Sequence, residues 1–259
     1  MAQLDMAQIC EFGKVQDEYV CIGEADNGGY IRLTGKKPDG DFRQEELKID
    51  SVMDETDMIT AADMDEAGCL YLAVSRMDDK RDITGKIVKV TPDDTVQILA
   101  DHIEENVKNI RLIADGYIIG CSDGMLQCFS MEGHMKYEIE NSDYTDICVA
   151  GDKLVVLTVR DIETYDISDG HVLETITSFD DAMTEGLEDA ASEKGKDALS
   201  CSNIMKYDEK SDQIYIMLGT GLFAYKLSDK LGIRLTTFKS ADIRYDFVVE
   251  DSDTFVAVT

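Results

Sequence analysis

The sequence has no tryptophan at all, only two prolines and only three histidines among its 259 residues. Carbohydrate sites commonly stack sugars on indole faces, so the lack of tryptophan argues against a sugar-binding platform. The histidines His102, His134 and His171 stand at polar turns or strand starts, and no GxSxG or HExxH motif occurs. Acyl-transfer and zincin chemistry are therefore excluded.

Basic residues are also scarce: 25 Lys and Arg stand against 54 Asp and Glu, which gives a net charge of -29. A surface of this charge is repelled by phosphate backbones and by anionic lipid headgroups. No run approaches the ~18 apolar residues of a membrane span, and residues 1–10 lack the basic start and apolar stretch of a signal peptide. We therefore expect neither a nucleic-acid partner nor direct membrane insertion of this chain.

The seven cysteines form no CxxC pair and no Cys/His cluster at zinc-site spacing. Six lie inside apolar, strand-like stretches, and the seventh is Cys201: the six are Cys10, Cys21, Cys69, Cys121, Cys128 and Cys148. We expect buried thiols there, kept reduced by intracellular or anaerobic surroundings. Phosphate cradles are missing too, because the glycine turns at 28–29, 116 and 219–221 fit neither the Walker nor the dinucleotide pattern. No metal or other cofactor is predicted.

What the sequence does contain is a repeated strand pattern. Short runs rich in Val, Ile, Tyr and Leu recur between Gly- and Asp-containing turns, and helical periodicity is nearly absent. The copies cover residues 107–140, 145–177, 204–238, 58–100 and, with a weaker fit, 7–49, followed by a half copy at 243–258. Seven aromatic residues alternate with polar neighbours in these runs and are predicted to pack in the core: Tyr71, Tyr117, Phe129, Tyr165, Tyr215, Phe223 and Tyr225.

Four-stranded units that recur about every 38 to 56 residues are typical of propeller blades. The sequence therefore predicts an all-β fold, a β-propeller of four-stranded antiparallel blades, with five clear units plus a partial one. Residues 1–259 are expected to form a single domain, which is a fragment of a longer protein if the parent has six or seven blades. An incomplete ring exposes sheet edges, so we expect the parent to continue; the alternative is that N-terminal residues complete the last blade.

The polar segment 179–200 breaks the strand pattern and is predicted to be an inter-blade insertion. Such an insertion is either a functional loop or simply a solvated one.

Carboxylates are densest in one cluster that could bind a hard cation such as calcium. Its members are Asp54, Glu55, Asp57, Asp63, Asp65 and Glu66. The helix-loop-helix calcium pattern fails, since Ala67 takes its fifth position and Val74 stands where a bidentate Glu is needed. An acidic turn over 63–68 is the simpler interpretation.

Lactonase-type propellers hold a metal in the central channel with carboxylates and an asparagine. Asn109, Asn141 and Asn203 are the asparagines available near blade starts. Nothing in the sequence separates them from turn or cap residues. No catalytic, cofactor-binding or metal-binding residue is therefore assigned.

The C-terminal part of the chain carries a family resemblance. The residues that carry it are Gly221, Leu222, Phe223, Tyr225, Leu235 and the strand pair of 250–258. This pattern, over less than a quarter of the chain, resembles the propeller region that precedes the solute-binding domain in large lipoproteins of Gram-positive anaerobes. The resemblance implies an extracytoplasmic, lipid-anchored parent that binds a solute for an ABC transporter, with this propeller as an accessory domain. Two features of that family, a lipobox cysteine and a solute-binding domain, are not recognisable in this sequence.

Without a catalytic motif, the sequence predicts a non-catalytic binding module that holds a protein, a peptide or a neighbouring domain of its parent chain. Two alternatives stay open. One is a metal-dependent hydrolase or lactonase-like enzyme with its site in the propeller channel. The other is an intracellular WD-repeat-like interaction scaffold, which would place the protein in the cytoplasm.

Overall fold

The computed structural model describes residues 8–25, 29–38, 40–77, 83–158, 161–176, 204–218, 221–237, 246–251 and 254–258. These residues form strands joined by turns, and they include no helix that could cross a membrane. The chain divides into two compact units, Met1–Ser142 and Asp143–Thr259. The expectation of a single domain stays a prediction.

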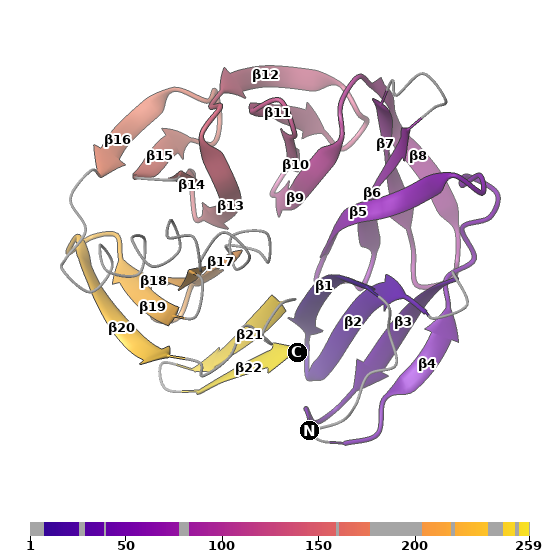
Figure 1. Ribbon diagram of the computed structural model, residues 1–259, viewed down its shortest axis with the longest axis horizontal. Helices are drawn as coiled ribbons and strands as arrows, with labels where there is room; N and C mark the ends of the chain where they lie inside the picture. Colours follow the sequence, from indigo (N-terminus) through magenta and orange to yellow (C-terminus); the bar gives the residue numbers. More distant parts are fainter. Residues whose placement is uncertain are drawn as a thin grey trace, which may run out of the picture. The chain divides into compact units, whose positions relative to one another are not determined.

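The first unit contains three four-stranded antiparallel sheets, here called blades 1 to 3, in which strand order follows chain order (Figure 1). Blade 1 consists of β1 (Gln8–Val15), β2 (Glu18–Glu24), β3 (Tyr30–Gly35) and β4 (Arg43–Glu46). Blade 2 consists of β5 (Asp57–Met64), β6 (Leu70–Met77), β7 (Ile83–Val90) and β8 (Val96–Ile103). Blade 3 consists of β9 (Val107–Ile113), β10 (Gly116–Cys121), β11 (Met125–Ser130) and β12 (Met135–Glu140).

The second unit repeats this plan in blades 4 and 5 and ends with a two-stranded sheet. Blade 4 consists of β13 (Tyr144–Ala150), β14 (Lys153–Thr158), β15 (Ile162–Asp166) and β16 (Val172–Ile176). Blade 5 consists of β17 (Ile204–Asp208), β18 (Gln213–Leu218), β19 (Gly221–Lys226) and β20 (Leu231–Thr237). The final pair is β21 (Asp246–Asp251) and β22 (Thr254–Val258).

Burial along the strands explains the apolar pattern of the sequence. All six residues of β10 are buried, as are five of the six in β14, because the second strand of a blade has packed neighbours on both faces. The fourth strands are largely exposed: in β12 the buried residue is Ile139, and in β16 it is Ile176. A continuous apolar run therefore marks an inner strand, and a mixed run marks the outer edge of a blade.

The core lies between the faces of consecutive blades. In the first unit one apolar cluster joins blades 1 and 2 and another joins blades 2 and 3, and the first strands β1, β5 and β9 contact one another in that order. In the second unit, clusters join blades 4 and 5 and then blade 5 and the β21–β22 pair, with β17 contacting both β13 and β21. All seven aromatic residues predicted to pack in the core are buried.

The predicted fold class is confirmed: the chain is all-β and built of five four-stranded antiparallel blades plus a partial unit. The main local departure from the repeat is in blade 1, the copy with the weaker fit, where the alternating run 41–49 forms a strand only over β4. The predicted insertion over 179–200, together with Asn203 and Cys201, lies outside the described residues.

Five of the six strand cysteines are buried: Cys21, Cys69, Cys121, Cys128 and Cys148; Cys10 is partly exposed. All six are free thiols. Burial raises the pKa of the Cys121 thiol to about 12, with smaller contributions from Asp123 and Glu105. Because the thiolate is the reactive form, such a thiol is protected both by its burial and by its protonation.

Burial also raises the pKa of the Cys10 thiol to about 12, so we expect Cys10 and the five buried cysteines all to react with a thiol reagent at least about tenfold more slowly in the folded protein than in the unfolded one at neutral pH. Labelling followed by mass mapping of each cysteine would measure this. The same protein unfolded in urea, in which all seven cysteines should label quickly, is the control. Fast labelling of most cysteines in the folded protein would contradict their place in the core.

Candidate functional site

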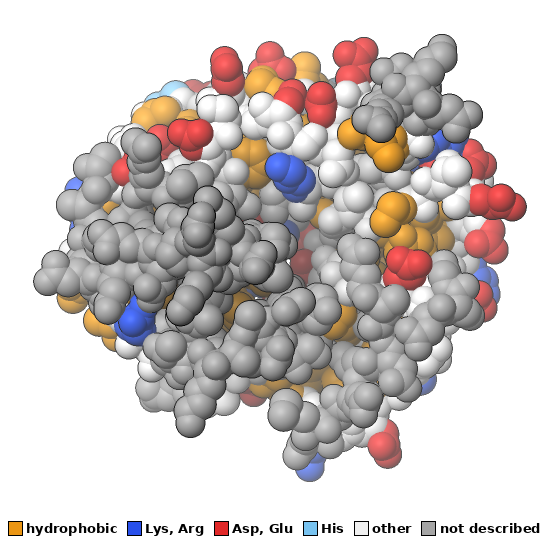
Figure 2. All heavy atoms as spheres, in the orientation of Figure 1, with side chains coloured by type: hydrophobic (Ala, Val, Ile, Leu, Met, Phe, Trp, Pro, Cys, Tyr) orange, Lys and Arg blue, Asp and Glu red, His pale blue; other side chains and the backbone are white. Residues whose placement is uncertain are grey.

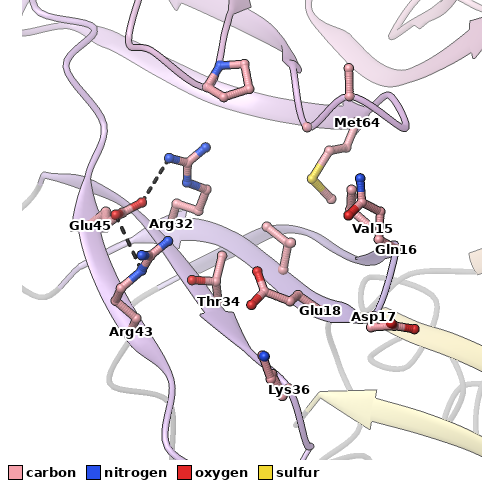
Figure 3. A pocket seen from close by; sticks show the side chains of 14 residues that line it. Val15, Gln16, Asp17, Glu18, Arg32, Thr34, Lys36, Arg43, Glu45 and Met64 are labelled. Carbon is pink, nitrogen blue, oxygen red and sulfur yellow. Dashed lines mark hydrogen bonds and ion pairs between the residues drawn. The ribbon is translucent and has the colours of Figure 1, made fainter.

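A cleft of about 510 Å³ opens between blades 1 and 2, at the end where the β1–β2 and β5–β6 turns lie (Figure 3). Blade 1 supplies Val15, Gln16, Asp17, Glu18, Val20, Arg32, Thr34, Lys36, Arg43 and Glu45. Blade 2 supplies Met64, Ala67, Gly68 and Pro92. One side of the cleft, the floor, is thus rich in charge, and the other side, the wall, is mainly apolar. The volume of the whole cleft is in the range of ligand-binding sites.

The floor follows from strand register. Val20 of β2 faces Thr34 of β3, which in turn faces Arg43 of β4, while Arg32 faces Glu45. Side chains two residues apart share a face of a strand, so the polar alternation of β3 falls on the side that looks toward blade 2. Deeper between the same two blades the packing is apolar.

Three cations and three carboxylates line this floor, and they are unevenly paired. Arg32 Nη2 donates to Glu45 Oε2 at 2.9 Å, and Arg43 Nε lies 3.4 Å from Glu45 Oε1 (Figure 3). The Arg32 side chain is only 16% exposed, and its Nε is buried without a hydrogen-bond partner among the described residues. Lys36, in the described part of the chain, forms no ion pair.

The wall is shaped by a capped turn. Asp65 Oδ1 accepts hydrogen bonds from the backbone N–H groups of Ala67, at 3.0 Å, and Cys69, at 2.8 Å. Gly68 has a φ of +81°, which favours glycine, and so the turn closes tightly beside Pro92. The carboxylate of Asp65 therefore holds the backbone that forms one edge of the cleft.

The structure divides the carboxylate cluster that the sequence offered as a calcium candidate. Asp65 caps the β5–β6 turn, and Asp63 Oδ2 accepts the backbone N–H of Leu112 in blade 3 at 2.7 Å. Asp54 and Asp57 lie at the opposite end of β5. In the described ranges no group of three or more His, Cys, Asp or Glu residues is placed to hold a metal ion. The acidic turn expected over 63–68 is present only from Asp65 onward, because Asp63 and Met64 belong to β5.

A second, smaller cavity of about 230 Å³ lies beside an ion-pair network of blade 2. Asp57 accepts from Arg76 Nε at 2.6 Å and from Lys86 Nζ at 2.8 Å, and Arg76 also pairs with Asp54. The Asp57 side chain is only 1% exposed. Burial by itself would raise its pKa, but the hydrogen bonds from Arg76 and Lys86 outweigh this effect and lower the pKa from 3.8 to about 2.

The ion pairs of Asp57 lead us to predict how the stability of the protein depends on pH. Because the pKa of Asp57 is lower in the folded state, its contribution is complete above the unfolded-state value and is lost as the pH falls toward 2. We expect Asp57→Asn to reduce the free energy of unfolding by about 2 kcal/mol near neutral pH, and by much less near pH 2. Urea unfolding of both proteins across this range would measure it.

The matched control is Asp50→Asn, because Asp50 is exposed and should give little difference at any pH. A difference between wild type and Asp57→Asn that stays constant with pH would contradict the ionic origin of the effect.

The remaining sequence candidates lie on separate elements. Asn109 is in β9, Asn141 follows β12, and His102 is in β8. His134 belongs to the turn whose backbone closes on Ser130, and His171 Nδ1 lies 2.6 Å from Asp169, which raises the pKa of His171. The sequence analysis missed the cleft residues Arg32, Lys36 and Arg43.

No protein-family model matches the sequence, and no curated protein matches it. Solved structures do resemble it. A chain of the mitotic checkpoint complex superposes with a TM-score of 0.57 at 10% identity, over 93% of this chain and 68% of that one. PorZ, a surface component of the type-IX secretion system of Porphyromonas gingivalis, superposes with a TM-score of 0.52 at 10% identity, over 90% of this chain and 29% of that one. BamB from Moraxella catarrhalis superposes with a TM-score of 0.50 at 8% sequence identity, over 91% of this chain and 66% of that one.

The chain has the β-propeller fold. At these identities the likeness shows the fold alone. The propeller also spans less than two thirds of the PorZ and BamB chains.

Proposed function

We propose that this propeller is a non-catalytic binding module that holds a segment of a partner protein in the cleft between blades 1 and 2. The observation that carries the proposal is the cleft itself, with a charged floor from β2, β3 and β4 and an apolar wall from the turns of blade 2. Binding sites commonly combine an apolar surface with a few polar groups that fix orientation.

The cations of the cleft stand out against an acidic surface, which favours a binding role for the cleft. Acidic side chains are spread over the described part of the face in Figure 2, and basic ones are fewer. Against that background three cations line one side of the cleft: Arg32 of β3, Lys36 just after β3, and Arg43 of β4. Concentrated donors inside a recess are typical of recognition rather than of solubility.

We further propose that the parent protein is extracytoplasmic and uses this propeller as an accessory domain for a solute-binding lipoprotein of an ABC transporter. The pattern Gly221-Leu222-Phe223-x-Tyr225 supports this, since it forms β19 in blade 5 as the resemblance implies. The bacterial propeller neighbours PorZ and BamB are consistent with such a setting at the level of fold.

The experiment is a selection of displayed peptides on the purified protein, followed by binding assays on a variant with a filled cleft. Thr34 lies on the floor between Val20 and Arg43, so Thr34→Phe should occupy the cleft and weaken selected peptides at least about tenfold. Gln97→Phe is the matched control, since Gln97 is exposed on β8.

Peptides that bind Thr34→Phe as well as wild type would contradict the cleft as the site. Failure to select any peptide that binds the folded protein saturably would contradict the proposed function. Melting with calcium and with EDTA tests the metal-dependent alternative, because a metal bound only by the folded state must raise the melting temperature.

A further inference from the structure

The two sides of the cleft differ in chemistry in a way that suits an extended chain lying between them. The floor on blade 1 is charged, and the wall on blade 2 is formed by Met64, Ala67 and Pro92. In an extended peptide, successive side chains point to opposite sides. A segment lying between the blades would therefore place charged residues on the floor and the residue between them on the wall.

The floor is also divided along its own length. Arg32, Arg43 and their shared partner Glu45 lie on β3 and β4, whereas Asp17 and Glu18 lie at the β1–β2 turn (Figure 3). Arg43 is aligned with Val20 of β2, and Arg32 is aligned with Ile22. These positions are two and four residues along β2 from Glu18, so the backbones of the two charge groups are about 12–14 Å apart. Residues i and i+2 of an extended chain lie about 7 Å apart. Two long side chains at those positions can span the remainder.

The cationic end has donors left to bind a ligand carboxylate. A guanidinium carries five N–H donors, and Arg32 uses one of its nitrogens for Glu45. Its buried Nε has no hydrogen-bond partner among the described residues, and a buried donor in this state is unfavourable. Arg43 contributes a single contact to Glu45 and is 69% exposed at the cleft. A carboxylate that enters here can accept from both guanidinium groups.

The other end has a net negative charge, because two carboxylates, Asp17 and Glu18, stand there against one cation, Lys36 (Figure 3). Asp17 is exposed and Glu18 half-buried, and in the described residues neither side chain has an ion-pair partner. The net charge of -29 attracts the cationic part of a ligand over long range, while Arg32 and Arg43 fix where its carboxylate ends.

We propose that the cleft binds an extended peptide segment of the pattern acidic-apolar-basic. Its carboxylate lies on Arg32 and Arg43, its apolar side chain on Met64 and Pro92, and its cation near Asp17 and Glu18. This inference rests on the proposed function and names the class of ligand that the same site takes.

The probe is the capped peptide acetyl-Ala-Glu-Leu-Lys-Ala-amide, titrated into the full chain by calorimetry or NMR at low salt. Replacing its Glu by Gln, or its Lys by Gln, should each weaken binding about fivefold or more, and added salt should weaken the parent peptide most. Replacing its Leu by Ser removes the apolar contact with Met64 and Pro92 and should also weaken binding. Free glutamate and lysine in place of the peptide distinguish a small-molecule ligand from a peptide segment.

On the protein side, Arg43→Gln should weaken the Glu peptide severalfold, part of the way to the level of the Gln peptide because Arg32 remains, and should leave the Gln peptide nearly unchanged, which makes a thermodynamic cycle. Lys108→Gln is the control, because Lys108 is an exposed cation of β9 that does not line the cleft. Both residues are exposed, so both variants should melt like wild type.

Equal binding of the Glu and Gln peptides would overturn the proposal, as would an equal effect of Lys108→Gln and Arg43→Gln. A third outcome is that no peptide of this series binds, whereas selected peptides of another pattern bind and Thr34→Phe blocks them. That result would overturn the ligand class while the proposed function stands.

Discussion

Gly133→Ala should destabilise the protein by about 3 kcal/mol or more, or prevent folding, whereas Gly68→Ala should cost only about 1 kcal/mol. Both glycines belong to the first unit, and their φ angles, +80° and +81°, carry the same backbone penalty for alanine. The difference is space. A Cβ on Gly133 would lie 1.8 Å from the carbonyl oxygen of Leu99, whereas one on Gly68 would meet Pro92 Cγ at 3.7 Å.

The physical reason for the large effect is that Leu99 O is a backbone atom of β8 and cannot rotate away. Gly133 lies in the β11–β12 turn of blade 3, so the clash would separate this turn from blade 2. Urea unfolding followed by circular dichroism would measure both variants. Equal losses of stability for the two alanines would contradict the close approach of blades 2 and 3 at this turn.

The repeated fold could be predicted because each blade has its own local signal. The run that becomes β10 is apolar throughout since the strand is buried on both faces, and turn residues bound it on each side. The end of blade 1 was predicted less well. Leu47 and Ile49 continue the alternation of 41–49 and are buried, yet they lie beyond β4, where the backbone N–H of Val52 bonds to Ile49 O and turns the chain. Alternating burial there does not require strand pairing.

The candidate site could not be predicted in the same way, because it depends on register and on contacts between blades. Nothing local to the sequence of β3 places Arg32 opposite Glu45, or Thr34 opposite Arg43. The alternation of Arg32, Thr34 and Lys36 was a usable signal for a polar strand face, but its opposing wall comes from turns of blade 2, more than thirty residues away. The acidic cluster of β5 was the more visible feature, and its carboxylates mostly serve backbone N–H groups and cations of blade 2.

Asp146→Ala should reduce the free energy of unfolding of the second unit by about 3 kcal/mol, and Asp146→Asn by about 1 kcal/mol. Asp146 of β13 is 2% exposed, and its Oδ2 accepts the backbone N–H of Met205 in β17 at 2.7 Å. Met205 is fully buried, so alanine at 146 would leave its N–H without an acceptor and without access to water. Asparagine keeps a side-chain oxygen at the same reach.

The first unit contains the same type of link, since Asp63 of β5 accepts the N–H of Leu112 in β9 at 2.7 Å, but there both residues are partly exposed. Water can replace a lost acceptor at an exposed N–H, so Asp63→Ala should cost less than Asp146→Ala, about 1 kcal/mol. Urea unfolding of the three variants would give this ranking. Equal effects of Asp146→Asn and Asp146→Ala would show that the charge of the carboxylate, rather than its role as an acceptor between neighbouring blades, supplies the stability.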